Sequence, residues 1–165
     1  MRIDFFNTPC AEGPRNDKIY GICDEQDGSK AFTDIDRDEN WIASVINDNG
    51  REVVFTAIDN CFKITKPGTN DLESTCDGML TFDNSLFFVE LKNKKEQWIP
   101  EAKQQLENTI RLFLQHHQNS GVRFRKAFAC NKRHPFFHTV ENEDQKRFFD
   151  KYGFRFDINS RIVIK

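Results

Sequence analysis

The stretch CDGMLTFDNSLFFVELKNK, residues 76–94, predicts a β-hairpin with charged residues at its open end. The segments GMLTF and LFFVELK have the apolar and aromatic composition of buried strands. The Asp-Asn pair between them tolerates the positive φ of a tight turn. Asp77, Glu90 and Lys92 interrupt the apolar pattern. Because charged groups are costly on core strands unless something pairs with them, this end is either a solvated hairpin end or a site.

The turn decides which residues of the two strands face each other. A two-residue turn pairs Leu80 with Phe87 and, further out, Asp77 with Glu90. Opposed residues on one side of an antiparallel pair have Cβ atoms about 4.5–5.5 Å apart. Two carboxylates at that distance repel unless a divalent cation lies between them or one of them holds a proton. Lys92 is two residues beyond Glu90 and therefore projects from the same face of the strand.

This arrangement suits metal-assisted hydrolysis of a phosphodiester bond. Carboxylate oxygens on a rigid sheet hold Mg²⁺ or Mn²⁺ and leave coordination positions for water and a phosphate oxygen. The ion lowers the pKa of its bound water and stabilises the charge that develops on phosphorus. A lysine beside it orients or deprotonates the attacking water, or offsets negative charge. We therefore predict Asp77, Glu90 and Lys92 as the catalytic residues of a nuclease with Mg²⁺ or Mn²⁺ as cofactor.

The same residues resemble the PD-(D/E)xK nuclease superfamily, which has the restriction-endonuclease-like fold. Asp77 is followed, after twelve residues, by Glu90-Leu91-Lys92 and then by a long amphipathic segment. The resemblance implies that Asp77 and Glu90 are metal ligands, that the Leu91 carbonyl also contributes, and that Lys92 is the catalytic lysine. The proline that precedes the aspartate in the family is Cys76 here.

Some branches of this superfamily carry a further acidic residue on the first core helix, where it completes the metal site. The resemblance makes Glu39 the candidate for this position. Three other acidic residues in the same predicted helix compete with it. They are Asp36, Asp38 and Asp48.

Other branches carry a glutamine, followed four residues later by a tyrosine, on the helix after the lysine strand. Gln104 and Gln105 lie in the corresponding segment, and the resemblance makes them candidates for binding substrate near the site. Their fourth neighbours are Asn108 and Thr109, so the tyrosine of the family pattern is absent.

The rest of the chain predicts an α/β fold with a mixed central β-sheet flanked by helices. The segments alternate between period-2 patterns typical of strands and 3.6-residue patterns typical of helices. Gly50 and Gly153 end two of the predicted segments, as expected at helix C-termini. The expected strands are residues 18–25, 30–35, 52–58, 78–82, 86–92, 122–130 and 161–165, and the expected helices are residues 36–50, 97–117 and 141–153.

These elements predict a single domain over residues 1–165. Residues 1–35 form an N-terminal β-hairpin added to the core. Residues 36–130 give the order helix, three strands, helix and strand, which is similar to the core of the restriction-endonuclease-like fold. Residues 131–165 add a C-terminal helix and strand. The chain is long enough to bury a core without disulfides or metals to stabilise it.

Composition places the chain among globular proteins and predicts a cytoplasmic location. Hydrophobic residues make up 38% and charged residues 30%. No apolar run approaches the roughly 18 residues that cross a membrane, and the N-terminus lacks the pattern of a signal peptide. Five cysteines without paired spacing favour reduced thiols over a disulfide framework.

The net charge of −2 is unevenly distributed. Residues 1–60 carry a net charge of −7 and residues 61–165 a net charge of +5, and there is no Asp or Glu in residues 112–140. Such a field guides a polyanion to one face, although an unevenly charged solvated surface gives the same pattern. If the hairpin is a nuclease centre, nearby cations would contact phosphates; otherwise they belong to basic surface loops. These cations are Lys94, Lys95, Lys132 and Arg133.

Two alternatives remain open at this stage. The spacing C-x₃-H-x₃-H of Cys130, His134 and His138 is compatible with zinc, but a fourth ligand is missing and Pro135 interrupts any helix. The chain could also be a catalytically silent or partner-activated nuclease-fold module that binds or acts as a scaffold in a larger complex. The acidic N-terminal third would suit a basic partner protein.

The expected partner is nucleic acid rather than a membrane. DNA is favoured over RNA because the superfamily favours DNA. The small size of the chain leaves room for a homodimer or for a place in a larger defence or repair complex. The sequence does not choose between these assemblies.

Overall fold

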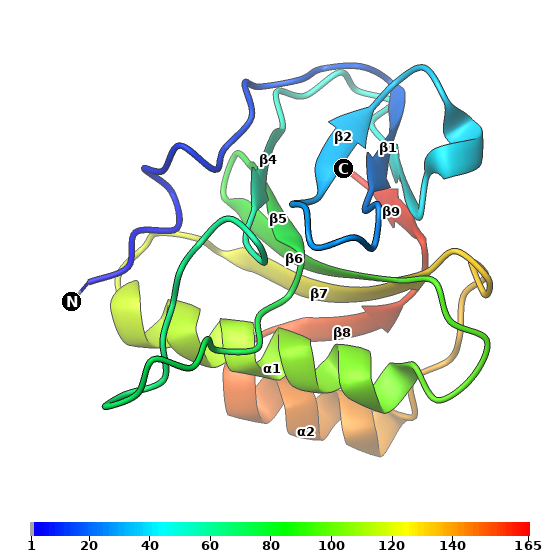
Figure 1. Cartoon of the computed structure of the whole chain (residues 1–165). Coiled ribbons are helices and arrows are strands. Elements are labelled where there is room, and N and C mark those ends of the chain that lie inside the picture. The colour runs from blue at the N-terminus through cyan, green and yellow to red at the C-terminus, as the bar shows by residue number, and fades with distance from the viewer. Residues whose placement is uncertain (1) are drawn as a thin grey trace.

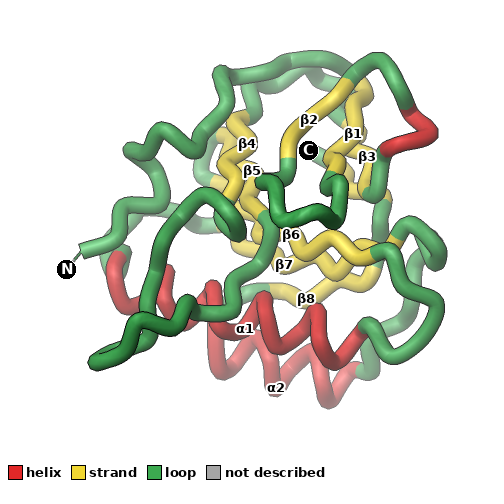
Figure 2. Tube along the Cα trace, in the orientation of Figure 1, coloured by secondary structure: helices red, strands yellow, loops and turns green. Residues whose placement is uncertain are grey.

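Two mixed β-sheets pack against each other, and two α-helices cover the outer face of the larger sheet (Figure 1). The computed structural model describes residues 2–165. Residues 2–18 and 58–77 consist mainly of loops that run along one side of the molecule (Figure 2). The α/β class predicted from the sequence is therefore confirmed, although the single central sheet is replaced by two sheets.

The larger sheet has the strand order β4-β5-β6-β7-β8. Strands β4, β5 and β6 are antiparallel neighbours, whereas β7 runs parallel to β6 and β8 runs parallel to β7. The parallel step from β6 to β7 is possible because helix α1 (Ile99–His116) forms the crossover between them. The five strands are β4 (Val54–Ala57), β5 (Gly78–Phe82), β6 (Ser85–Lys92), β7 (Phe124–Asn131) and β8 (Arg155–Ile158).

The β5–β6 hairpin has the register predicted from its turn. Leu80 pairs with Phe87, and the last pair of the ladder joins Gly78 to Val89. Asp83 in the turn has a φ of 48°, the left-handed conformation that Asp and Asn tolerate. One step beyond the ladder, the register brings Asp77 opposite Glu90.

The two α-helices form where the apolar pattern predicts them. Helix α1 carries Pro100 in its first turn and buries one face against the large sheet. Helix α2 (Asn142–Tyr152) ends at Gly153, whose φ of 72° is the left-handed conformation typical of a helix C-terminus. No helix in residues 2–165 has both the length and the apolar character needed to span a membrane.

The smaller sheet has the strand order β2-β1-β3-β9. Strands β1 and β2 form the N-terminal hairpin predicted from the sequence. Strand β9, the predicted last strand, belongs to this smaller sheet and not to the large one, and it pairs in parallel with β3. The strands are β1 (Ile19–Cys23), β2 (Phe32–Asp34), β3 (Ala43–Ile46) and β9 (Arg161–Val163).

The helix predicted for residues 36–50 is wrong. The segment contains a short 3₁₀ helix, η1 (Asp38–Asn40), followed by strand β3. Ala43 and Val45 are buried in β3 while the residues between and after them are partly exposed, which is the period-2 pattern of a strand. Pairing with β1 on one side and β9 on the other outweighs the local helical pattern. Both partner strands come from other parts of the chain, so the local pattern did not indicate this pairing. The core thus lacks the first helix expected over residues 36–130.

The prediction of five reduced cysteines is also wrong. Cys10 and Cys61 form a disulfide, and their Cα atoms are 6.0 Å apart, within the usual range for a disulfide. The bond joins two loop segments 51 residues apart in sequence, so no local spacing indicated it. The other three cysteines, Cys23, Cys76 and Cys130, are free and buried.

Two separate apolar cores determine which way β6 presents its side chains. Leu86 and Phe88 belong to the core between the large sheet and the helices. Val89 and Leu91 belong to the core between the two sheets. Because side chains alternate along a strand, Glu90 falls on the helix side of the sheet, and so does residue 92.

Candidate active site

Three charged side chains are buried where the β5–β6 hairpin meets the first turns of α1. Glu90 and Lys92 lie at the end of β6 and are 2% and 6% exposed, and Asp77 directly precedes β5 and is 6% exposed. Charged residues are seldom this buried unless they are paired. The structure therefore rules out a solvated hairpin end at this position.

Asp77 and Glu90 are joined by hydrogen bonds that cross the end of the hairpin. The Asp77 backbone N–H donates to Glu90 Oε1 over 3.2 Å. The Leu91 backbone N–H donates to Asp77 Oδ2 over 2.7 Å. The structure thus brings together the two carboxylates that the hairpin register placed opposite each other.

Burial makes it costly for both carboxylates to carry charge. For Asp77, burial and then repulsion from Glu90 raise the pKa well above its usual range. For Glu90, burial raises the pKa to about 7, although Lys92 acts to lower it. The pair therefore favours a proton or a cation over two free negative charges.

Lys92 is held by three oxygen acceptors. Its Nζ lies 3.1 Å from Glu90 Oε2 and 2.6 Å from Glu101 Oε1. It also donates to Gln105 Oε1 over 2.6 Å. Burial by itself lowers the pKa of Lys92, but Glu90 and Glu101 outweigh that effect and raise the pKa. The side chain is therefore a fixed ammonium group next to the carboxylate pair.

Glu101 was not anticipated from the sequence. It lies in the first turn of α1 and bridges Lys92 to Lys94, whose Nζ is 2.8 Å from Glu101 Oε2. Hydrogen bonds from these two lysines lower the pKa of Glu101 to about 2. The only signal in the sequence was its place in the first turn of the helix that follows the lysine strand.

Of the two candidate glutamines, the structure brings only Gln105 to the site. Gln104 is exposed on α1, and no hydrogen bond joins it to Lys92 within the described residues. One turn after Gln105, the buried Thr109 hydroxyl donates to the Gln105 carbonyl over 2.9 Å and accepts the Cys76 N–H over 2.7 Å. Thr109 thereby fixes α1 against the residue that precedes Asp77.

Glu39 does not join the site. It is exposed in η1, which packs against β1 of the small sheet, whereas Glu90 points to the helix side of the large sheet. Two other acids, missed in the sequence, act on the pair. Asp24, just after β1, raises the pKa of Asp77, and Asp59, after β4, raises that of Glu90. Nothing in the sequence marked them beyond their places after strands.

The donor atoms at the site are oxygens of the kind that Mg²⁺ and Mn²⁺ prefer. The Lys92 carbonyl accepts a hydrogen bond from Lys132 on the β7 side, so the Leu91 N–H and carbonyl face the opposite, Asp77 side. Asp77, Glu90 and the Leu91 carbonyl are therefore the groups that could hold a hard divalent ion here. Within residues 2–165, no group of three or more His, Cys, Asp or Glu side chains is arranged to hold a metal.

The predicted phosphate-binding cations lie in two loops next to the site. Lys94 and Lys95 lie in the loop after β6, and both are exposed. The Lys132 N–H donates to the Lys92 carbonyl over 2.9 Å, and Arg133 Nε donates to Asn93 Oδ1 over 3.3 Å. The loop after β7 is thus hydrogen-bonded to the end of β6 and to the loop that follows it.

The structure does not form the zinc cluster considered from the sequence. Cys130 is fully buried, and its thiol donates to the Asn159 carbonyl. His134 Nε2 is hydrogen-bonded to the Lys95 carbonyl over 2.6 Å. His138 is exposed, with its ring against Trp98. The three side chains therefore have separate surroundings.

Comparisons of the chain with models of known protein families, with curated proteins and with solved structures each found no match.

Proposed function

We propose that the protein is a divalent-metal-dependent nuclease of the restriction-endonuclease-like type, which hydrolyses phosphodiester bonds of DNA. The observation that supports this proposal is the buried pair Asp77 and Glu90, with the Lys92 ammonium 3.1 Å from Glu90. The β4-β5-β6 meander, the α1 crossover and the parallel strand β7 supply the order of elements that this type of core uses after its first helix.

The electrostatics of the pair support a cation ligand. Burial raises the pKa of both carboxylates, so their ionised forms destabilise the folded protein. A divalent ion between the two carboxylates would offset their repulsion, and their negative charges would bind the ion. Mg²⁺ or Mn²⁺ would supply a bound water of lowered pKa and a positive centre for the phosphate.

Lys92 acts in this proposal as an electrostatic group rather than as a base. Its raised pKa keeps it protonated at neutral pH, so it is a poor proton acceptor. Its ammonium group can offset charge on the scissile phosphate and hold the attacking water by a hydrogen bond. Glu101 and Gln105 fix its position, which is how a charged group is prepared before substrate binds.

Calorimetric titration of Mn²⁺, with plasmid and single-stranded DNA cleavage on the same preparations, tests the proposal. Asp77→Asn should lose both metal binding and Mn²⁺-dependent cutting. Asp83→Asn is the matched control, because Asp83 is an exposed aspartate at the other end of the same hairpin. Lys92→Met should keep metal binding and lose cutting. Absence of saturable Mn²⁺ binding to the wild type would refute the metal-dependent nuclease.

A second candidate is a catalytically silent or partner-activated module in a larger complex. Two observations favour it: Lys92 is engaged by Glu101 and Gln105, and within the described residues no three acidic, histidine or cysteine side chains are arranged to hold a metal. A partner could supply the missing ligand or draw Glu101 away. Metal binding without cutting by the isolated chain would favour this candidate.

A further inference from the structure

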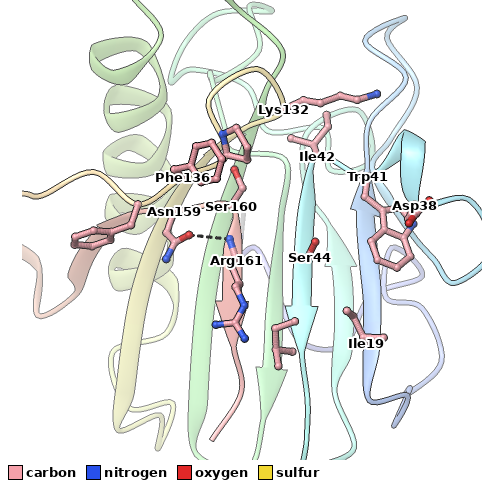
Figure 3. A pocket seen from close by; sticks show the side chains of 13 residues that line it. Ile19, Asp38, Trp41, Ile42, Ser44, Lys132, Phe136, Asn159, Ser160 and Arg161 are labelled. Carbon is pink, nitrogen blue, oxygen red and sulfur yellow. Dashed lines mark hydrogen bonds between the residues drawn. The ribbon is translucent and has the colours of Figure 1, made fainter.

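A pocket of about 720 Å³ opens between the small sheet and the loop after β7, apart from the carboxylate pair (Figure 3). The loop residues 132–137 form one wall, and Trp41 with Asp38 forms the opposite wall. Arg161 and Ser44, from the neighbouring strands β9 and β3, lie between them. The volume is in the range of pockets that bind small molecules.

The rim of this pocket exposes aromatic rings. Phe136 is 81% exposed and Phe137 is 61% exposed, although large apolar side chains next to each other are normally covered. On the opposite wall, Trp41 Nε1 donates to Asp34 Oδ2 over 2.9 Å, and its indole packs directly on Gly21. One wall is therefore a fixed ring, and the other offers two uncovered rings.

The residues that line the pocket carry two positive charges and one negative charge. Lys132 and Arg161 line it, and both are exposed and form no ion pair within residues 2–165. Asp38 is the one acid among the lining residues. Uncovered rings beside unpaired cations are the combination that binds single-stranded nucleic acid, because bases stack on the rings while cations contact phosphates.

The loop that forms one wall of the pocket is hydrogen-bonded to the end of β6 and to the loop after it. The Lys132 N–H donates to the Lys92 carbonyl over 2.9 Å, and His134 Nε2 is bonded to the Lys95 carbonyl over 2.6 Å. The loop that carries Phe136 and Phe137 is thus fixed to the segment that directly follows Lys92.

We propose that this pocket binds unpaired bases of a single-stranded nucleic acid. If the protein is the nuclease proposed above, this pocket implies that its substrate is a nucleic acid with a single-stranded segment. This link to cutting rests on the proposed function. Duplex would be disfavoured in the pocket, because the faces of paired bases are stacked on one another and cannot reach Phe136 and Phe137.

Fluorescence anisotropy in EDTA tests the binding without any cutting. The probes are a labelled 15-nucleotide oligo(dT) and a 15-base-pair duplex. Replacing both Phe136 and Phe137 by alanine should weaken oligo(dT) binding about tenfold or more, because stacking contributes roughly 1–3 kcal/mol per base. Phe149→Ala is the control, because Phe149 is also an exposed ring, 54% exposed, and lies on α2 away from the pocket. Lys132→Ala should reduce the salt dependence of binding by about 0.7 in log–log slope for one lost phosphate contact.

The inference is overturned if the double variant and Phe149→Ala bind oligo(dT) equally well, or if the wild type prefers the duplex. It is also overturned if the wild type is a dimer by sedimentation, the double variant is a monomer, and oligo(dT) binding is unchanged, because the rings then serve self-association. Metal-dependent cutting is a separate readout. If the double variant loses oligo(dT) binding and the wild type never cuts, this inference stands and the nuclease is refuted. If the wild type cuts and the double variant keeps its oligo(dT) binding, only the pocket is refuted.

Discussion

Replacing Glu90 by glutamine should make the metal-free protein more stable at alkaline pH. The folded state raises the pKa of Glu90 from its usual 4.5 to about 7, chiefly because the side chain is buried. At about 1.4 kcal/mol per pH unit, this difference corresponds to about 3 kcal/mol. Folded Glu90 binds its proton more tightly than unfolded Glu90, so this contribution is fully present below pH 4.5 and is lost as the pH rises through 7.

The measurement is urea unfolding of the wild type and Glu90→Gln at pH 5 and pH 8, without metal. The stability of the variant relative to the wild type should increase by about 3 kcal/mol from pH 5 to pH 8. For a chain of this size this corresponds to a change of about 6–12 °C in relative Tm. Glu96→Gln, in the exposed loop after β6, should follow the wild type at both pH values.

Added Mn²⁺ should reverse the order at pH 8. A ligand at a thousand times its Kd stabilises the folded state by about 4.1 kcal/mol, which exceeds the difference of about 3 kcal/mol, and only the wild type keeps both carboxylates. A relative stability that is the same at both pH values would refute the reasoning, because the charged form of Glu90 would then not be penalised by burial. Unchanged relative stability with excess Mn²⁺ would count against the metal site.

Three other predictions follow from local geometry. Thr109→Val should lower stability by about 1–3 kcal/mol in urea unfolding, because it leaves the buried Cys76 N–H without an acceptor, whereas Thr109→Ser should lose less. Gly21→Ala should cost about 1–3 kcal/mol or displace Trp41, visible in near-ultraviolet circular dichroism, because the new Cβ would lie 1.9 Å from the indole. The Nε2 of His117 accepts the Phe5 N–H, and burial lowers the pKa of this histidine. The contribution of neutral His117 to the free energy of unfolding is therefore fully present above pH 6.5 and is lost as the pH falls. In His117→Gln, unfolding at pH 7.5 and 5.5 should show a smaller loss of stability on acidification.

The hairpin and its charged end were predictable because the information is local. A two-residue turn and the alternation of side chains determine the register, so Asp77 opposite Glu90, and Lys92 on the same face, follow from residues 76–94 alone. The long helix α1 was predictable for a similar reason, since its apolar stripe repeats over five turns.

Other features depended on partners far away in the sequence. Residues 43–46 have a composition compatible with helix or strand, and β1 and β9 decide in favour of the strand. The Cys10–Cys61 disulfide and the clustering of Asp24 and Asp59 near the pair arise where separate loops meet. Glu39 was predicted as a metal ligand by resemblance to a family helix. That helix does not form here, so the prediction has no structural basis.

The sequence by itself determined the α/β class, the hairpin register and the identity of the three central charged residues, because near neighbours control these features. Only the tertiary structure decided that the charges are buried, that Glu101 and Gln105 hold Lys92, and that a pocket with exposed aromatic rings opens beside the small sheet. Burial and pairing depend on which distant surfaces meet, and the pattern of one segment does not indicate which surface packs against it.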